Sequence, residues 1–389
     1  MRSKIIFLIL LLIQLNVNAQ KGMFKKGTIQ PSVYKEQLAY TLVNQLIYVT
    51  VEIEGKEYIF LVDTGAPSTI RKNLDVDFVF LKKESIMDAM QNTQEVDYVT
   101  LPSIKIGNLT FDNFVFMQED LTVFEDLGID GIIGGNITAR GAWDFDLQKN
   151  SITVSNTLDQ AWLKEANFSA FKMKKTDIGT PLLSLTYFDR IKEKGIFFDT
   201  GYSGLFYLSA SMFDKVKPYV SDYITGEGIL SKNAFGNSVG ETALLPLKMK
   251  LGQQHIPIFF SDVEEDEESN LGVEWLSHYR VIIYKNTFYF SNEGQRGFET
   301  KFVGKGIKTA VENGELLVTF VWHNSPAHKQ GIQLGDKIQA VNGQQVADLT
   351  LNEQLELKKT METSPEITVE ITRLNHPIVL KEEVLLTGE

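Results

Sequence analysis

The chain has 389 residues, of which 43% are hydrophobic and 23% are charged, with a formal net charge of −12 and no cysteine. This length allows two or three domains with ordinary packed cores. Without cysteine, disulfides, thiol nucleophiles, cysteine–zinc sites and cysteine lipid anchors are all excluded. The acidic balance makes nucleic acids and anionic membrane surfaces poor partners.

The N-terminal segment has the features of a secretory signal peptide. Arg2 and Lys4 precede a continuous apolar stretch over 5–13, and a small-residue end at Ala19 follows it. This order is typical of a cleaved signal, here residues 1–19. The alternative is a membrane anchor, but spanning a bilayer takes roughly 20 apolar residues. We expect an exported protein, either periplasmic or secreted, with no membrane span after signal cleavage.

The rest of the chain is predicted to be mainly β. Apolar or alternating runs bounded by Gly, Asn and Asp are typical of strands. Such runs occur at 46–53, 57–62, 101–107, 111–117, 151–155, 181–188 and 286–291. Helical spacing is limited to short pieces around 158–165, 210–217 and 352–361.

Two parts of the chain resemble each other. FLVDTG returns as IFFDTG, so that Asp199 follows Asp63 by 136 residues. Two further segments are repeated in the same order, one of them with a two-residue slip: LQKNSITVS (147–155) as IYKNTFYFS (283–291), and GIIGG (131–135) as NLGVE (270–274). Several ordered matches near one offset indicate two similar lobes, predicted at 30–157 and 158–295.

A different pattern begins near residue 300. Ser325-Pro326-Ala327, Gly335-Asp336 and Asn342-Gly343 follow one another as a helix cap, a turn into a strand and a tight turn. Over 300–387 the chain resembles a bacterial PDZ domain, which has an α+β fold.

The PDZ resemblance implies a peptide-binding site. In that family a peptide C-terminus pairs with a sheet edge, and backbone amides of a glycine-containing loop hold its carboxylate. The corresponding loop here lies within 303–308, and the candidate peptide-binding residues are Gly304, Lys305, Gly306 and Ile307. The loop departs from the Gly-Leu-Gly-aromatic form that is common in the family.

The two Asp-Thr-Gly motifs suggest a catalytic carboxylate pair. Two carboxyl groups held close together share one proton, because both cannot ionise cheaply. The ionised member can take a proton from an attacking water, and the protonated member can donate to the carbonyl oxygen. A hydroxyl beside each Asp can tie the two loops together, and Gly lets the backbones approach closely. Asp63 and Asp199 are therefore the candidate catalytic residues, and no metal or other cofactor is expected.

With these motifs, the chain resembles aspartic proteases of the pepsin and retroviral (retropepsin-like) type, in particular bacterial members with a C-terminal PDZ domain. FLVDTGAPST is retropepsin-like, while two lobes in one chain are pepsin-like. The resemblance implies two β-barrel-like lobes with a peptide or protein substrate in the cleft between them. The residues that it implies as dyad supports are Thr64, Gly65, Thr200 and Gly201. It also implies hairpins over the cleft, around 88–98 and 226–238, with GIIGG behind the first catalytic loop. The second hairpin is glycine-bearing and polar, as is expected of a mobile flap.

The chain departs from the family pattern directly after each glycine. Ala66 and Tyr202 stand there, whereas family members often have a hydroxyl residue that bonds a carboxylate oxygen. The resemblance therefore leaves open which group, if any, makes the two carboxyls unequal.

Four other interpretations follow from the residues, two of them structural and two functional. The acidic run 261–270 is expected to be a solvated insertion, and Asp144 and Asp146 are expected to be ordinary strand-end carboxylates. A different class of function also fits the sequence, namely a non-catalytic exported peptide-binding or scaffold protein on the same fold. A third possibility is a processing enzyme that cuts one dedicated partner. The sequence fixes no oligomeric state.

Overall fold

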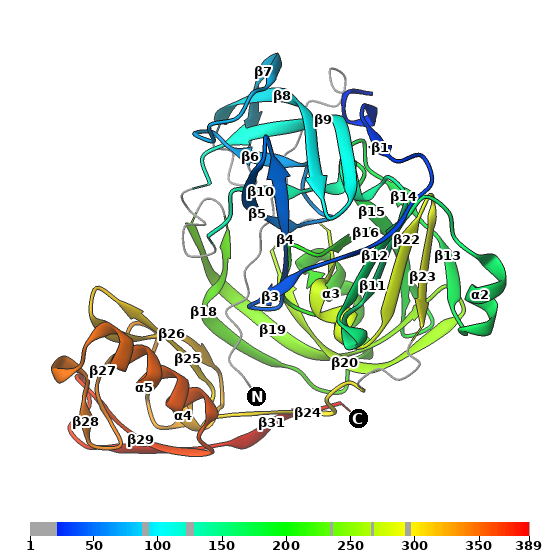
Figure 1. Ribbon diagram of the computed structural model, residues 1–389. Helices are drawn as coiled ribbons and strands as arrows, with labels where there is room; N and C mark the ends of the chain where they lie inside the picture. Colours follow the sequence, from blue (N-terminus) through cyan, green and yellow to red (C-terminus); the bar gives the residue numbers. More distant parts are fainter. Residues whose placement is uncertain are drawn as a thin grey trace.

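The computed structural model describes residues 22–87, 93–121, 128–233, 236–265, 268–291 and 297–388. The predicted signal peptide lies outside the described residues, as do parts of both predicted hairpins, 88–92 and 234–235. The described chain is mostly β, as predicted, with the segment predicted as a PDZ domain near its C-terminus (Figure 1). None of the helices within these ranges is long and apolar enough to cross a membrane.

A nine-stranded sheet forms the first lobe. Its strands are β1 (Thr28–Gln30), β3 (Thr41–Val43), β4 (Leu46–Ile53), β5 (Lys56–Val62), β6 (Thr69–Arg71), β7 (Val79–Met87), β8 (Thr93–Ile106), β9 (Leu109–Glu119) and β10 (Gly131–Ile133). The short β10 lies between β5, to which it is parallel, and β6, to which it is antiparallel. All three β10 residues are buried, because neighbours cover this strand on both sides. The helix α1 (Gly135–Thr138) follows it directly.

A six-stranded sheet joins the two halves of the chain. Its order is β13 (Ser169–Lys172), β23 (Thr287–Ser291), β22 (Arg280–Tyr284), β11 (Ala142–Asp146), β12 (Ser151–Ser155) and β2 (Lys35–Leu38). At its centre β11 and β22 are antiparallel, and Phe145 faces Val281. These two residues lie 136 positions apart, the offset of the sequence repeat. The local two-fold axis that relates the lobes therefore passes through this pair.

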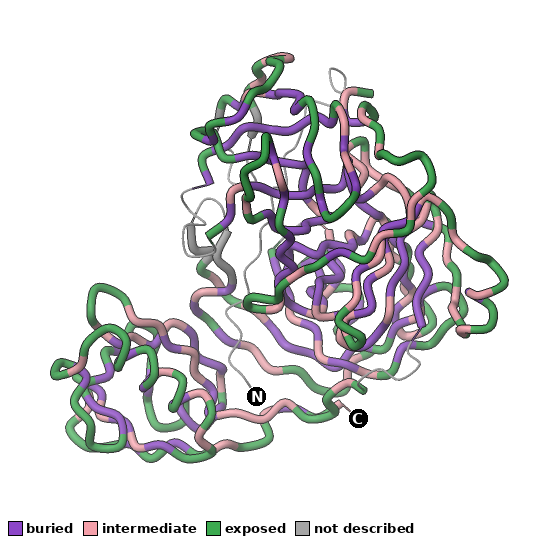
Figure 2. Tube along the Cα trace, in the orientation of Figure 1, coloured by how far each residue is buried: buried purple, intermediate pink, exposed green. Residues whose placement is uncertain are grey.

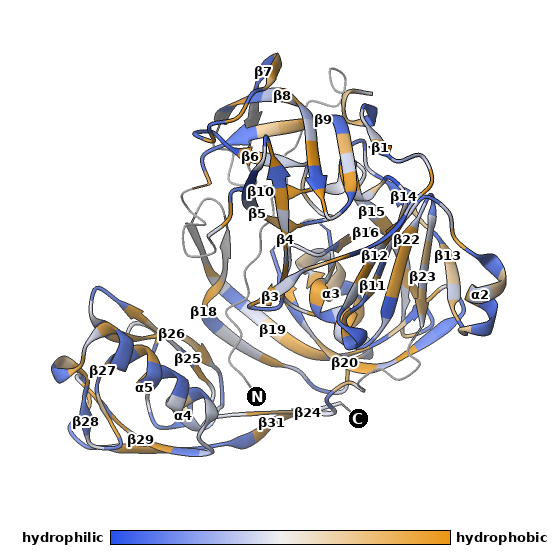
Figure 3. Cartoon of the chain, in the orientation of Figure 1, coloured by the Kyte–Doolittle hydropathy of each residue, from blue (hydrophilic) through white to orange (hydrophobic). Residues whose placement is uncertain are grey.

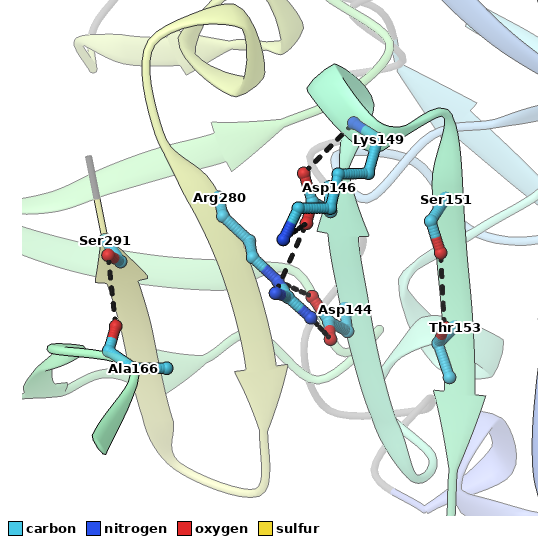
Figure 4. Close-up of polar contacts among 8 residues, drawn as sticks. All are labelled: Asp144, Asp146, Lys149, Ser151, Thr153, Ala166, Arg280 and Ser291. Carbon is cyan, nitrogen blue, oxygen red and sulfur yellow. Dashed lines mark hydrogen bonds and ion pairs between the residues drawn. The ribbon is translucent and has the colours of Figure 1, made fainter. Parts of the chain in front are cut away.

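A guanidinium group binds two carboxylates across this centre (Figure 4). Arg280 on β22 donates from Nε and Nη2 to Asp144, at 2.9 and 2.7 Å, and its Nη1 lies 3.2 Å from Asp146. The two carboxylates have side-chain exposures of 14% and 5%. The expectation that Asp144 and Asp146 are ordinary strand-end carboxylates is therefore wrong, because they bind the cation of the other lobe.

We expect Arg280→Met to destabilise the protein by about 2–4 kcal/mol, because it leaves two largely buried carboxylates without their cation. Urea unfolding would measure the change. Arg71→Met is the matched control, since the Arg71–Asp130 pair is more exposed, at 45% and 20%. The control should cost less than about 1 kcal/mol. Equal losses in the two variants would contradict the importance of the Arg280 network.

The second half of the chain builds a larger sheet that continues into the PDZ domain. Its strands in this half are β14 (Lys174–Lys175), β15 (Pro181–Tyr187), β16 (Ile191–Asp199), β17 (Phe206–Ser209), β18 (Ile224–Asn233), β19 (Gly236–Leu251), β20 (Gln254–Glu264) and β21 (Asn270–Gly272). We call this part the second lobe. Its helices are α2 (Gln160–Glu165) and α3 (Ala210–Val216). The short β21 repeats the place of β10, being parallel to β16 and antiparallel to β17.

The acidic run 261–270 is buried strand at both of its ends, whereas Glu265 is exposed and 266–267 lie outside the described residues. Ser261 and Asn270 have no exposed surface, and Glu264 is 6% exposed. The segment is the end of β20 and the start of β21, which are both covered by other strands of the lobe. The expectation of a solvated insertion is therefore wrong for the two ends of the run, because the strands β20 and β21 extend into them.

The C-terminal domain contains β24 (Lys301–Gly304), β25 (Ile307–Glu312), β26 (Glu315–Trp322), α4 (Pro326–Lys329), β27 (Lys337–Val341), β28 (Gln344–Gln345), α5 (Leu351–Thr363), β29 (Glu366–Ile371), β30 (Ile378–Lys381) and β31 (Glu383–Thr387). Ser325 caps α4 by accepting a hydrogen bond from His328 N. Asn342 and Gly343 both have positive φ, at 50° and 80°, as the tight turn requires.

Two apolar cores hold the molecule together. One continuous core runs through both lobes, and a separate core fills the PDZ domain. Figure 2 shows the buried segments along the inner strands of the lobes, and Figure 3 shows hydrophobic residues gathered on α3, β20 and β22. A third, small cluster joins the PDZ domain to the second lobe through Leu230, Leu244, Phe320, Trp322 and Leu386.

Candidate active site

The two aspartates end equivalent strands. Asp63 directly follows β5, and its backbone N–H donates to Ile133 O at 3.0 Å. Asp199 ends β16, where it lies opposite Gly272 of β21. In both lobes a buried short strand therefore fixes the backbone at the aspartate.

A glycine lies behind each aspartate loop, as the family resemblance implies for the first. A Cβ added to Gly134 would lie 2.3 Å from Ser68 N, and one added to Gly272 would lie 2.2 Å from Gly204 O. Real Cβ atoms do not approach backbone atoms so closely, so only glycine fits. The same loop support is thus built twice, once in each lobe.

The two threonines tie the lobes together at the centre of the site. Thr64 Oγ1 donates to Phe198 O at 2.6 Å, and Thr200 Oγ1 donates to Val62 O at 2.7 Å. Each hydroxyl also accepts from the backbone N–H of the other threonine, at 3.1 Å. All four bonds are buried, so water does not compete with them. The hydrogen bonds fix the spacing between the two aspartate loops.

The glycines of the motifs bring the carboxyl groups face to face. A Cβ on Gly65 would lie 2.5 Å from Asp199 Cγ, and one on Gly201 would lie 2.3 Å from Asp63 Oδ2. Each carboxyl group therefore rests against the glycine of the opposite motif. The two side chains are almost completely buried, with exposures of 0% and 1%.

Burial sets the protonation of the pair. It raises the pKa of Asp63 well above its usual range, and the adjacent charge of Asp199 raises it further. Burial also raises the pKa of Asp199, but hydrogen bonds from Asp63 and from Asn270 act in the opposite direction. The two groups titrate as one coupled pair that holds a proton to higher pH than isolated carboxyls do.

Asn270 is a contact that the sequence interpretation missed. Its Nδ2 donates to Asp199 Oδ2 at 3.0 Å, and the residue has no exposed surface. The available signal was a polar residue in a buried strand, at the place where the first lobe has Ile132. The two-residue slip in the repeat concealed this correspondence.

The four candidate PDZ residues lie around the turn from β24 to β25. Lys305 does not reach into solvent: its Nζ donates to Ser364 O at 2.7 Å and lies 3.5 Å from Glu382. Gly306 has φ +90°, and a Cβ there would lie 2.0 Å from the Ser325 side chain. The loop also borders a cavity of about 830 Å³ whose opposite wall includes Leu205 and Phe206 of the second lobe.

The glycines of the second predicted hairpin allow a close contact with another strand, whereas the sequence suggested that they make the hairpin mobile. β18 pairs with β26 of the PDZ domain, with Gly226 opposite Trp322 and Gly228 opposite Phe320. A Cβ on Gly228, whose φ is +139°, would lie 2.2 Å from Thr319 O. These glycines let the PDZ strand approach the hairpin, so one sheet runs from the second lobe into the PDZ domain (Figure 1).

Two family models match the chain. Residues 49–137 match the model described as aspartyl protease, and residues 289–372 match the PDZ domain. No curated protein matches significantly.

The solved structures to which the chain shows similarity include one protein from soybean and one from Irpex lacteus. Basic 7S globulin from soybean is 11% identical, with a TM-score of 0.44 over 67% of this chain and 95% of that one. An aspartic proteinase from Irpex lacteus is 12% identical, with a TM-score of 0.43 over 67% of this chain and 97% of that one.

The two family matches support a function of the protease type. They confirm the resemblance found in the sequence: the chain carries an aspartyl protease segment followed by a PDZ domain.

Proposed function

We propose that the protein is an exported aspartic endopeptidase that hydrolyses peptide bonds with Asp63, Asp199 and an activated water. The single observation that carries the proposal is the buried carboxyl pair, in which each aspartate rests against the glycine of the other motif. The hydrogen-bonded threonines hold this geometry. The substrate would be a peptide or protein segment between the lobes.

The reaction needs one proton shared between the two carboxyls. The ionised carboxylate takes a proton from water as the oxygen attacks the peptide carbonyl, and the protonated carboxyl donates to the carbonyl oxygen. A tetrahedral intermediate results, and its collapse transfers a proton to the leaving nitrogen. The raised pKa of Asp63 keeps that proton available above the pH at which free carboxyls have lost theirs.

Cleavage of a peptide library across a pH series tests the proposal. The proposal would be supported by cleavage that requires both Asp63 and Asp199. A statine-type mimic of the transition state should also block this cleavage. Export is tested by N-terminal sequencing of the mature protein from the periplasm and from the medium, which should begin after Ala19. The non-catalytic alternative predicts peptide binding without cleavage at any pH. A processing enzyme for one partner predicts little library cleavage but tight binding of the mimic.

The PDZ domain is proposed either to recruit substrate by its C-terminus or to couple peptide binding to opening of the cleft. The contact between β18 and β26 supports this coupling, since it places the PDZ sheet and the second-lobe hairpin in one hydrogen-bonded array. His323 strengthens the junction, because its N–H donates to Thr225 O and its Nδ1 lies 2.8 Å from Thr225 Oγ1. A peptide pairing beside β25 would be two strands away from the hairpin.

Gly228→Val is expected to separate β18 from β26, because the new side chain meets Thr319 O and φ +139° disfavours a branched residue. Hydrogen exchange should then rise in 226–228 and 320–322. Gly240→Ala on β19 is the control, since its Cβ would lie an ordinary 3.6 Å from Leu230. Unchanged exchange in Gly228→Val would show that the junction does not depend on this close approach.

A further inference from the structure

The hydrogen bonds to the two carboxyl groups are unequal. Oδ1 of Asp63 accepts from Gly65 N and Ala66 N, at 2.8 and 3.0 Å, and Oδ1 of Asp199 accepts from Gly201 N at 2.8 Å. The Oδ2 atoms of the two aspartates differ in whether they accept a hydrogen bond. Asn270 donates to that of Asp199, whereas within the described part of the chain that of Asp63 is buried without a donor of its own.

The first lobe has no donor at the place of Asn270. In each lobe the equivalent residue lies two positions before the glycine behind the aspartate loop. It is Ile132, before Gly134, in the first lobe and Asn270, before Gly272, in the second. Both residues lie on the buried short strand beside the aspartate strand. An isoleucine side chain has nothing to donate. The difference between the two Oδ2 atoms therefore arises at one equivalent position of the two short strands.

We propose that Asn270 is a positioning residue that makes Asp199 the ionised general base and leaves the shared proton on Asp63 as general acid. This inference rests on the proposed function. An amide N–H stabilises a carboxylate more than a carboxylic acid. Because Asn270 is fully buried, water does not supply a substitute for the bond. In this chain the side-chain donor comes from Asn270 on β21 rather than from the side chain of residue 66 or 202, directly after either motif glycine.

The opposing influences on the two pKa values agree with this division of roles. Burial and then the neighbouring charge of Asp199 raise the pKa of Asp63, against the lowering effect of the hydrogen bonds from Gly65 and Ala66. The hydrogen bond from Asn270 is among the causes that lower the pKa of Asp199 against the effect of burial. Loss of the amide should consequently raise the pKa at which the base forms.

The pH dependence of kcat/KM tests the role. Asn270→Leu keeps a similar shape and removes the donor, so the acidic limb should move upward by about one pH unit and kcat/KM should fall about tenfold. Asn270→Ala, a second variant without the donor, should shift the limb in the same direction. Ser269→Ala is the matched control, since Ser269 is equally buried and bonds Glu193 and Ser209. It should lower stability and leave both limbs in place.

An acidic limb that stays in place in folded Asn270→Leu and Asn270→Ala would overturn the inference. A shift as large in Ser269→Ala would do the same, since it would reduce Asn270 to a structural role. Titration of ¹³C-labelled aspartate carboxyls by NMR reads the same pKa values without turnover. A wild type that cleaves nothing would refute the proposed function, and the NMR titration would still decide the role of Asn270.

Discussion

Asp63→Asn and Asp199→Asn, made one at a time, are each expected to lower kcat/KM by about 10³-fold or more. An amide at either position transfers no proton to the carbonyl oxygen and takes none from the attacking water. Because the pair acts as a unit, the double variant should be scarcely worse than either single one. Cleavage of the best library substrate at its optimal pH measures the loss, and cleavage that survives both substitutions would rule out the mechanism.

The same variants should be at least as stable as the wild type at neutral pH. Burial raises the pKa of Asp63, so its contribution to folding is complete below about pH 4 and is lost as the pH rises through the folded value. An amide carries no such titration. Urea unfolding at pH 4 and pH 7 should therefore show a smaller decline for Asp63→Asn than for the wild type. A steeper decline would contradict the raised pKa.

Gly65→Ala and Gly201→Ala are expected to reduce activity as severely as the aspartate variants. The added methyl group would lie 2.5 Å from Asp199 Cγ in one case and 2.3 Å from Asp63 Oδ2 in the other. No atom can stay at such a distance, so the two loops must separate and the threonine hydrogen bonds must lengthen. We expect a loss of about 1–3 kcal/mol in the free energy of unfolding as well.

Gly297→Ala is the control for the methyl group itself. A Cβ at Gly297 would meet nothing within 4 Å, so activity and stability should remain near those of the wild type. Measuring kcat/KM and urea unfolding on all three variants separates the effect of crowding the carboxyl groups from the effect of an added methyl group. Full activity in Gly65→Ala or Gly201→Ala would show that the carboxyls do not need this close approach.

The meeting of the Asp63 and Asp199 carboxyl groups could be predicted because it depends on short motifs. Asp-Thr-Gly after an apolar strand already specifies the carboxyl, the hydroxyl and the close approach, and a second copy at a fixed offset predicts that the two meet. The glycine behind each loop was also visible, since GIIGG and NLGVE recur in order. Each of these features lies within a few residues of sequence.

Other parts of the site depended on contacts between distant segments. In the sequence, Asn270 is a single polar residue in a segment with a weak strand pattern. Only the alignment of β21 with β10 reveals its place beside Asp199. Gly226 and Gly228 suggested a mobile hairpin, because the approach of β26 cannot be inferred from local composition. Arg280 and Asp144 also carried no local signal, since each belongs to a different lobe.

The pairing of Arg280 with Asp144 bears on how the two halves of the chain can associate. These residues occupy the same place in the repeat, 136 positions apart, and they meet beside the axis that relates the halves. If two copies of the first half came together, Asp144 would face Asp144, and two copies of the second would bring Arg280 against Arg280. Opposite charges at one repeated position thus oppose self-association of either half and favour the mixed pair, so the duplicated halves are no longer interchangeable.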